Sequence, residues 1–525
     1  MYDFIIVGAG SAGCVLAHRL SADPQHRVLL LEAGPRDWHP FIHMPAGISK
    51  LVNLKGVNWN YETEPEPRLG GRRLWWPRGR VLGGSSSINA MCYIRGHRAD
   101  YDEWAAMGNP GWDWDAVLPY FKRAENQERG ADALHGSGGM LNVQDLKYRN
   151  PLSRVFLDAA REAGFAGNED FNGAGQEGFG WYQVTQKGGA RWSTAAGYLA
   201  SARDRPNLTV LTGALATQVR IEGGRAVGVR YRHRGRSAAA EAAREVILAG
   251  GALNSPQLLM LSGVGPAALL DAHGIARRQD LPGVGRNLHD HLDACTIHQC
   301  TQRITYDRAS EVMTALRYFL FRDGPGTSNI AETGGFARTR LAPDDRPDVQ
   351  FHFVPAMLDD HGRNRLPGDG YTLHACALRP LSRGHLELAS ADPAQPVRIH
   401  ANYLGDPEGR DLQTLLEAVR LARRILGTAA FAPYRGSELY PGATVQDDAA
   451  LAEFVRRKAE TIYHPVGTCR MGNDAQAVVD TQLRVHGIGA LRVVDASVMP
   501  RLVGGNTNAP VVMIAEKASD LILAA

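Results

Sequence analysis

The chain of 525 residues is long enough for two or three domains, each with a sizeable hydrophobic core. Its 44% hydrophobic and 22% charged residues are typical of a globular α/β protein, and a net charge of +3 excludes the basic footprint of a nucleic-acid-binding protein. The six cysteines form no CxxC pair, which argues against a disulfide framework or a zinc cage and favours a reducing, cytoplasmic compartment. Because no apolar run approaches about 18 residues, we expect no membrane-spanning helix, whereas peripheral contact with the inner membrane stays open.

The first 33 residues carry the most informative motif. An apolar run precedes Gly8, Gly10 and Gly13, and a second apolar run ends at Glu32, which predicts a buried strand, a glycine turn, a helix and a second strand. The glycines permit a tight turn, close approach of the backbone to a pyrophosphate and close helix–strand packing, with the helix N-terminus facing the phosphates. A carboxylate at position 32 can bind ribose hydroxyls but repels a 2′-phosphate. The motif therefore predicts a dinucleotide site for FAD or NAD rather than NADP.

Several segments in the middle of the chain predict further elements. Residues 79–89, rich in glycine and serine, predict a second backbone cradle for a phosphate or a ring. Asn150 and Pro151 cap a predicted helix that ends at Gly164. Residues 208–211 and 226–231 predict strands, as does the continuous apolar run 245–252, which leads into a helical stretch at 255–261. Because that run is short and unbroken, it predicts a parallel strand buried on both faces, as in a doubly wound sheet.

The residue composition differs between about residues 299 and 461, which are rich in prolines and arginines. Segments there that alternate polar and apolar residues, such as 384–389, predict an antiparallel sheet. After it come an apolar strand ending at Asp495, a loop and a final helix. The predicted fold class is therefore α/β with an α+β second lobe: a doubly wound, Rossmann-like nucleotide-binding domain and a discontinuous substrate domain built on an antiparallel sheet. The nucleotide-binding domain is expected to comprise residues 1–150, 192–298 and 462–525, and the substrate domain residues 151–191 and 299–461.

Four segments together resemble the glucose-methanol-choline (GMC) flavoprotein oxidoreductases, in particular their choline dehydrogenase and aliphatic alcohol dehydrogenase branch. They are the N-terminal glycine motif, residues 79–89 with Gly96 and Asp100, residues 251–265, and residues 463–472 with 506–510. Weaker matches at 281–292 and 379–384 extend the resemblance over nearly the whole chain. It implies a flavoprotein with FAD held between the two lobes.

The resemblance also implies, position by position, which residues contact FAD. Ser11 and Ala12 are expected at the pyrophosphate and Glu32 at the ribose. Asn89 stands where some relatives have a histidine bonded covalently to the flavin, and because an amide cannot form that bond we expect non-covalent FAD. The full implied set is Gly8, Gly10, Ser11, Ala12, Gly13, Glu32, Ala33, Val81, Gly84, Ser85, Asn89, Ala90, Cys92, Ala216, Val219, Asp495, Ala496, Asn506, Ala509 and Pro510.

Oxidation of an alcohol needs a base for the hydroxyl proton and a donor that positions the oxygen while hydride leaves for flavin N5. The resemblance gives the first role to His464 and the second to Asn508. The alternative interpretation is a core His464 bonded to backbone and an Asn508 that only caps the last helix. The cap and the catalytic role are compatible, since the positive end of that helix would stabilise a reduced flavin.

Two other groups invite a functional interpretation. His289, Asp290 and His291 have two histidines on one strand face, but no third ligand has suitable spacing, so we expect no metal site and place these residues near the cofactor. Glu332 either reaches the substrate cavity, where it would steer a cationic or polyhydroxylated substrate, or forms a buried ion pair or turn cap.

The sequence thus predicts an FAD-dependent alcohol dehydrogenase whose partners are a small-molecule alcohol and an electron acceptor, which is a quinone, an artificial acceptor or oxygen. The alternatives are an oxidase of the same fold that uses oxygen and releases hydrogen peroxide, a non-redox relative such as a hydroxynitrile lyase or a photodecarboxylase, and a flavin-binding protein without activity.

Overall fold

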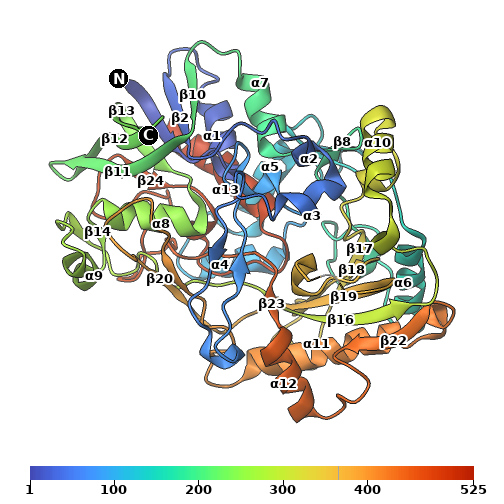
Figure 1. Ribbon diagram of the computed structural model, residues 1–525. Helices are drawn as coiled ribbons and strands as arrows, with labels where there is room; N and C mark the ends of the chain where they lie inside the picture. Colours follow the sequence, from blue (N-terminus) through green and yellow to red (C-terminus); the bar gives the residue numbers. More distant parts are fainter. Residues whose placement is uncertain (365) are drawn as a thin grey trace.

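The computed structural model describes residues 1–364 and 366–525 and contains two seven-stranded sheets (Figure 1). The first sheet has the order β10-β2-β1-β13-β12-β11, with β24 paired to β13. Its strands are β1 (Tyr2–Val7), β2 (Val28–Glu32), β10 (Leu208–Thr212), β11 (Ala214–Glu222), β12 (Arg225–His233), β13 (Arg236–Leu248) and β24 (Leu491–Val493).

Parallel pairing at the centre of the first sheet confirms the expected nucleotide-binding fold. β1 pairs in parallel with β2 on one side and with β13 on the other, and β10 continues the parallel order beyond β2. The apolar residues Phe4, Ile5 and Ile6 are fully buried, as expected for a central strand of a parallel sheet. Helix α1 (Ser11–Leu20) follows β1 directly and packs beside the C-terminal helix α13 (Asn508–Leu523).

Strand β13 corrects the prediction of a short strand at 245–252. Its end, from Ala242 to Leu248, pairs in parallel with β1, with an irregularity before Glu245, whereas residues 236–241 form an antiparallel hairpin with β12. The added half is rich in alanine and largely exposed, so neither β-propensity nor burial marks it in the sequence; its pairing with β12 forms it. Helix α8 (Gly251–Leu261) likewise starts at the glycine turn, ahead of the expected residue 255.

The second sheet is antiparallel, as expected, with the order β22-β16-β19-β18-β17-β7 and β23 paired to β16. Its strands are β7 (Gly178–Trp181), β16 (Leu292–Cys300), β17 (Thr333–Ala337), β18 (Val349–Val354), β19 (Gly370–Ala377), β22 (Arg435–Tyr440) and β23 (Glu460–Thr461). Helix α6 (Pro151–Glu162), whose N-cap Asn150 accepts a hydrogen bond from the Leu152 N–H as its sequence predicts, packs on this sheet with α11 (Arg410–Leu426).

The expected domain boundary at residues 298/299 falls inside β16, which belongs entirely to the second sheet. The shift in composition becomes visible only after this strand has begun, because its first seven residues are almost all buried. We therefore propose a boundary just before Leu292, with the other expected boundaries unchanged.

Shorter elements connect the two sheets and cover their edges. The helices are α2 (Pro40–His43), α3 (Ile48–Leu51), α4 (Arg98–Ala106), α5 (Trp114–Ala124), α7 (Ala200–Ala202), α9 (Ala267–Ala272), α10 (Glu311–Phe321) and α12 (Asp448–Lys458). The strands are β3 (Tyr61–Glu62), β4 (Trp75–Trp76), β5 (Glu125–Gln127), β6 (Leu141–Val143), β8 (Gln186–Lys187), β9 (Ala190–Arg191), β14 (Val264–Gly265), β15 (Gln279–Asp280), β20 (His385–Glu387) and β21 (Arg398–His400). Within the described ranges, each helix is too short or too polar to cross a bilayer.

Candidate active site

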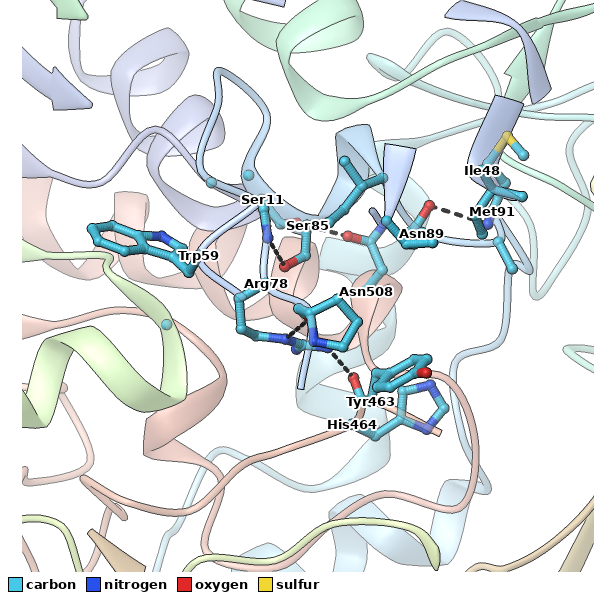
Figure 2. A pocket seen from close by; sticks show the side chains of 18 of the residues that line it. Ser11, Ile48, Trp59, Arg78, Ser85, Asn89, Met91, Tyr463, His464 and Asn508 are labelled. Carbon is cyan, nitrogen blue, oxygen red and sulfur yellow. Dashed lines mark hydrogen bonds between the residues drawn. The ribbon is translucent and has the colours of Figure 1, made fainter. Parts of the chain in front are cut away.

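A cavity of about 1050 Å³ is lined by residues of both lobes. One end is formed by the β1–α1 turn and the end of β2, and another part by β18 and by residues 462–465. Figure 2 shows His464, Asn508 and Asn89 around this pocket, with Trp59 at one side and Ile48 at the other. The cavity is large enough for a dinucleotide and a small substrate together.

The nucleotide end of the cavity has the backbone geometry that the glycine motif predicts. A Cβ atom on Gly13 would lie 1.8 Å from the carbonyl oxygen of Gly8, and one on Gly84 would lie 2.6 Å from the Cα atom of Gly10. Helix α1 starts at Ser11 without a side-chain cap, which leaves its first N–H groups for an anion. This end of the cavity therefore fits the pyrophosphate of FAD.

Two buried carboxylates hold the loops around that end. Glu32 accepts hydrogen bonds from the N–H groups of Ala9 (2.9 Å) and Gly34 (2.7 Å), and burial raises its pKa to about 7. Asp495 accepts a bond from the N–H of Gly251 (2.8 Å), at the start of α8. Both side chains also line the cavity, so they shape the pocket that the adenosine part of FAD would occupy.

Most of the predicted site residues converge on this cavity. It is lined by Gly8, Gly10, Ser11, Ala12, Glu32, Ala33, Gly84, Ser85, Asn89, Ala90, Cys92, Ala216, His464, Asp495, Ala496, Asn506 and Asn508. The predicted residues that do not line it are Gly13, Val81, Val219, Ala509 and Pro510. Two of these side chains pack in the hydrophobic core instead. Val81 is fully buried in a small apolar cluster with Ile42 and Ile88, and Val219 lies in the main core of the nucleotide-binding lobe.

A chain of hydrogen bonds determines which nitrogen of His464 is free to act as a base. His291 Nε2 lies 3.3 Å from the carbonyl oxygen of Leu378, which can only accept, so His291 carries its proton on Nε2 and its Nδ1 is an acceptor. His464 Nδ1 lies 2.9 Å from that acceptor and therefore carries a proton. His464 Nε2 is then unprotonated, and it accepts a bond from the Asn506 amide Nδ2 at 3.2 Å. The resulting tautomer presents the lone pair that a general base needs.

Burial and neighbouring groups keep His464 in its neutral form. Burial lowers the pKa of His464 well below its ordinary value, and the positive charge of Arg78 lowers it further. Its backbone N–H donates to Asp290 Oδ1 (2.7 Å), which fixes the position of the residue. A neutral imidazole is the form that accepts a proton from an alcohol.

Asn508 is the first residue of α13, so the interpretation of this residue as the helix cap is wrong: the cap position is Thr507, and no side chain caps the helix. The Asn508 Oδ1 atom accepts a hydrogen bond from Ser11 Oγ (2.7 Å). With its oxygen bound to Ser11, the amide nitrogen is the donor that remains for a ligand in the cavity. Such a donor stabilises an oxygen that gains negative charge.

The side chains of His289, Asp290 and His291 have different partners and do not converge on one point. His289 Nε2 lies 3.0 Å from Asn287 Oδ1, Asp290 accepts bonds from Tyr403 and Thr461, and His291 contacts His464. Among the described residues, the groups that could hold a metal ion are Asp293, Cys295 and His374, and His385, Glu387 and His400. This segment therefore positions His464, the expected base. The expectation that it binds no metal stays a prediction.

Glu332 does not line the cavity, which corrects the interpretation of this residue as a group that steers the substrate. It is fully buried and accepts hydrogen bonds from the Asn150 N–H, Ser153 Oγ and Ser328 Oγ, each 2.7 Å long, and from Tyr306. The carboxylate therefore anchors the start of α6 and belongs to the framework of the substrate lobe.

Sequence reasoning missed two polar residues of β18. Gln350 Nε2 donates to Asn506 Oδ1 (3.1 Å), which orients the amide that contacts His464, and His352 lines the cavity. Both are buried and alternate with Phe351 and Phe353 along the strand. Polar residues at every second position of a buried strand were the available signal.

Comparison with known proteins identifies the family. A GMC oxidoreductase profile for the N-terminal region matches residues 2–293, and one for the C-terminal region matches residues 380–515. The chain belongs to the GMC oxidoreductase family. It is 51% identical to an alcohol dehydrogenase (acceptor) of Pseudomonas putida, over 100% of this chain and 96% of the relative, and 50% identical to the mitochondrial choline dehydrogenase of Mus musculus, over 99% and 89%. Pyridoxine 4-oxidase from Mesorbium loti superposes with a TM-score of 0.91 at 33% identity, covering 99% of both chains.

This GMC oxidoreductase is an FAD-dependent enzyme, and Asn89 predicts how it holds the cofactor. The Asn89 Oδ1 atom accepts bonds from the Met91 N–H (3.0 Å) and from Arg191 (2.9 Å), and an amide forms no covalent bond to a flavin. Precipitating the purified enzyme with acid should therefore release all of the flavin into the supernatant. Flavin absorbance that stays with the washed pellet would contradict non-covalent binding.

Proposed function

We propose that this enzyme oxidises the CH–OH group of a small alcohol to a carbonyl, with His464 as the base, Asn508 as the donor to the substrate oxygen and a quinone as the electron acceptor. The observation that carries the proposal is the unprotonated Nε2 of His464 in the cavity that also fits FAD. The similarity to dehydrogenases that act on alcohols supports oxidation over the lyase and decarboxylase alternatives.

In the proposed reaction, the substrate hydroxyl donates its hydrogen bond to His464 Nε2 in place of the Asn506 amide. The proton moves to this nitrogen, while the amide of Asn508 donates to the same oxygen and limits the charge that develops on it. FAD, held as described above, supplies the acceptor for the hydride that leaves the carbinol carbon. Orientation of the C–H bond by the two side chains supplies much of the rate.

The lining of the cavity favours an uncharged substrate. Ile330, Val354 and Ile462 line it together with His464, and Glu332, the carboxylate expected to attract a cation, is buried elsewhere. Two carboxylates of the substrate lobe line the cavity, and both are engaged: Glu311 with Lys50 (2.9 Å), and Asp307 with the N–H groups of Met357 (3.1 Å) and Gly370 (3.0 Å). A quaternary ammonium group would therefore lose hydration among the apolar side chains without gaining an unpaired counter-charge. We therefore propose an apolar alcohol, and expect kcat/KM for a linear aliphatic alcohol to exceed that for choline.

Steady-state turnover with a panel of alcohols tests the reaction type. The proposal predicts carbonyl product in the presence of a quinone or a redox dye, with little oxygen uptake when the dye is omitted. Rapid oxygen uptake with formation of hydrogen peroxide would instead identify an oxidase. An FAD-loaded enzyme that forms no carbonyl from any alcohol in the panel would overturn the proposed function.

The dependence of kcat/KM on pH tests the neutral state of His464, and variants at position 291 test His291 as a positioning residue. Because the pKa of His464 lies well below its ordinary value, the base is already neutral, and we expect kcat/KM to change little between about pH 8 and pH 6. Replacement by His291→Phe removes the acceptor that holds the proton on His464 Nδ1 but leaves His464 buried, so kcat/KM should fall at every pH in this range without a shift of the profile. His291→Gln, which restores an acceptor, should recover part of the loss. A His291→Gln variant that is as slow as His291→Phe would assign His291 a purely structural role.

A further inference from the structure

Helix α10 turns an apolar face to the outside of the molecule. Eleven large hydrophobic side chains are exposed among the described residues, and six of them lie on this one helix. Exposed apolar side chains are therefore concentrated here and not scattered over the surface. The six are Val312, Met313, Leu316, Phe319, Leu320 and Phe321, between 44% and 75% exposed. Figure 1 shows α10 at the periphery of the molecule, away from both large sheets. A surface helix with this face open needs a partner.

The opposite face of α10 is the one that contacts the protein. Glu311, Thr314 and Ala315 line the cavity that also holds His464, and Tyr318 is fully buried, with its hydroxyl donating to the carbonyl oxygen of His43 (2.7 Å). These positions share one side of the helix because they are three, four and seven residues apart. The helix is thus attached through its more polar side and forms a wall of the active-site cavity, which is the reverse of an ordinary surface helix.

Cationic side chains surround the apolar face. Lys50 contacts Glu311 at the start of α10 (2.9 Å), Arg317 contacts Asp323 (2.7 Å), and Lys147 donates to the Arg322 carbonyl oxygen at its end (2.6 Å). With Arg322 itself, four cations stand against two carboxylates, so the rim of the patch is positive. An apolar helix face with a positive rim is complementary to the boundary between headgroups and acyl chains in an anionic bilayer.

We propose that α10 binds peripherally to an anionic phospholipid membrane, with its apolar face among the upper acyl chains. Because the inner face of α10 lines the cavity, this orientation brings one wall of the active site to the bilayer surface. In this orientation an apolar alcohol or a quinone would exchange directly between the lipid phase and the site, a consequence that rests on the proposed function. The binding itself requires no turnover and can be measured separately.

Co-sedimentation of the FAD-loaded enzyme with vesicles tests the proposal. The double variant Leu316→Gln/Leu320→Gln removes two exposed apolar side chains that do not line the cavity. The matched control Leu381→Gln/Leu523→Gln changes two leucines that are 41% and 43% exposed elsewhere on the surface. Vesicles of phosphatidylcholine with about 30% phosphatidylglycerol are compared with pure phosphatidylcholine.

We expect the wild-type enzyme and the control to bind the anionic vesicles, more weakly as salt is added, and the α10 variant to lose about tenfold or more in partition coefficient. Dye-linked turnover should stay unchanged in both variants, which separates this proposal from the proposed function. A wild-type enzyme that stays in the supernatant, or an α10 variant that sediments like the wild type, would overturn membrane binding. A wild-type dimer that the α10 variant converts to monomer, without vesicle binding, would identify the patch as an interface between copies.

Discussion

The variant His464→Ala should lose between about 100-fold and 10,000-fold in the rate of alcohol oxidation, the range that a positioned general base supplies. The variant loses the unprotonated Nε2 atom and also leaves His291 Nδ1 and the Asn506 amide without their partner. We expect it to bind FAD as the wild type does, because the nucleotide end of the cavity is built from other segments. Turnover per bound flavin, measured with a dye acceptor, checks the prediction.

A matched control is His298→Ala, which removes another buried histidine that does not line the cavity. His298 stacks on Tyr371 in the second sheet, so its loss should lower thermal stability but leave turnover per flavin within about threefold of the wild type. Equal losses of turnover in the two variants would show that general damage to the fold, and not the base, explains the effect of His464→Ala.

The variant Gly13→Ala should lose most of its bound flavin. The new methyl carbon would lie 1.8 Å from the Gly8 carbonyl oxygen, a distance that no packing tolerates, so α1 must move away from β1. Overpacking of this kind costs about 1–3 kcal/mol of stability, and here it also displaces the helix N-terminus that faces the pyrophosphate site. The ratio of flavin to protein absorbance after purification, together with the melting temperature, measures both effects.

Gly56→Ala provides the control for this substitution. A Cβ atom at Gly56 meets nothing within 4 Å, and its backbone lies outside the left-handed region, so the same chemical change should leave flavin content and melting temperature unaltered. A Gly13→Ala enzyme that is as yellow and as stable as Gly56→Ala would contradict the close helix–strand packing on which the nucleotide site depends.

The parts of the fold that follow from local sterics could be predicted from the sequence. The spacing of Gly8, Gly10 and Gly13 determines the turn, and the Asn150 side chain caps the first turn of α6 by accepting a backbone hydrogen bond. The long half of β13 could not be predicted, because its alanines take their conformation from pairing with β12. Local sequence carries no record of such pairing.

Within the site, the sequence indicated which residues meet but not what they do to one another. His464 and His291 are 173 positions apart, and only the folded chain shows that their ring nitrogens form a hydrogen bond. Glu332 carries a carboxylate that could bind a polar substrate, yet in the folded chain it is buried and accepts hydrogen bonds from four donors of the protein itself. Helix α10 shows the same limit, because a run of apolar residues predicts burial, and only its place in the fold leaves it exposed.

Reduction of the bound flavin by an alcohol in the absence of oxygen tests the central claim most directly. Rapid mixing of the enzyme with a linear alcohol should bleach the visible flavin band, and deuterium on the carbinol carbon should slow the bleaching several-fold, because that C–H bond breaks in the step. In His464→Ala the bleaching should be slowed to the extent that steady-state turnover is. A flavin that stays oxidised with every alcohol, or one that is bleached equally fast with and without His464, would contradict the account.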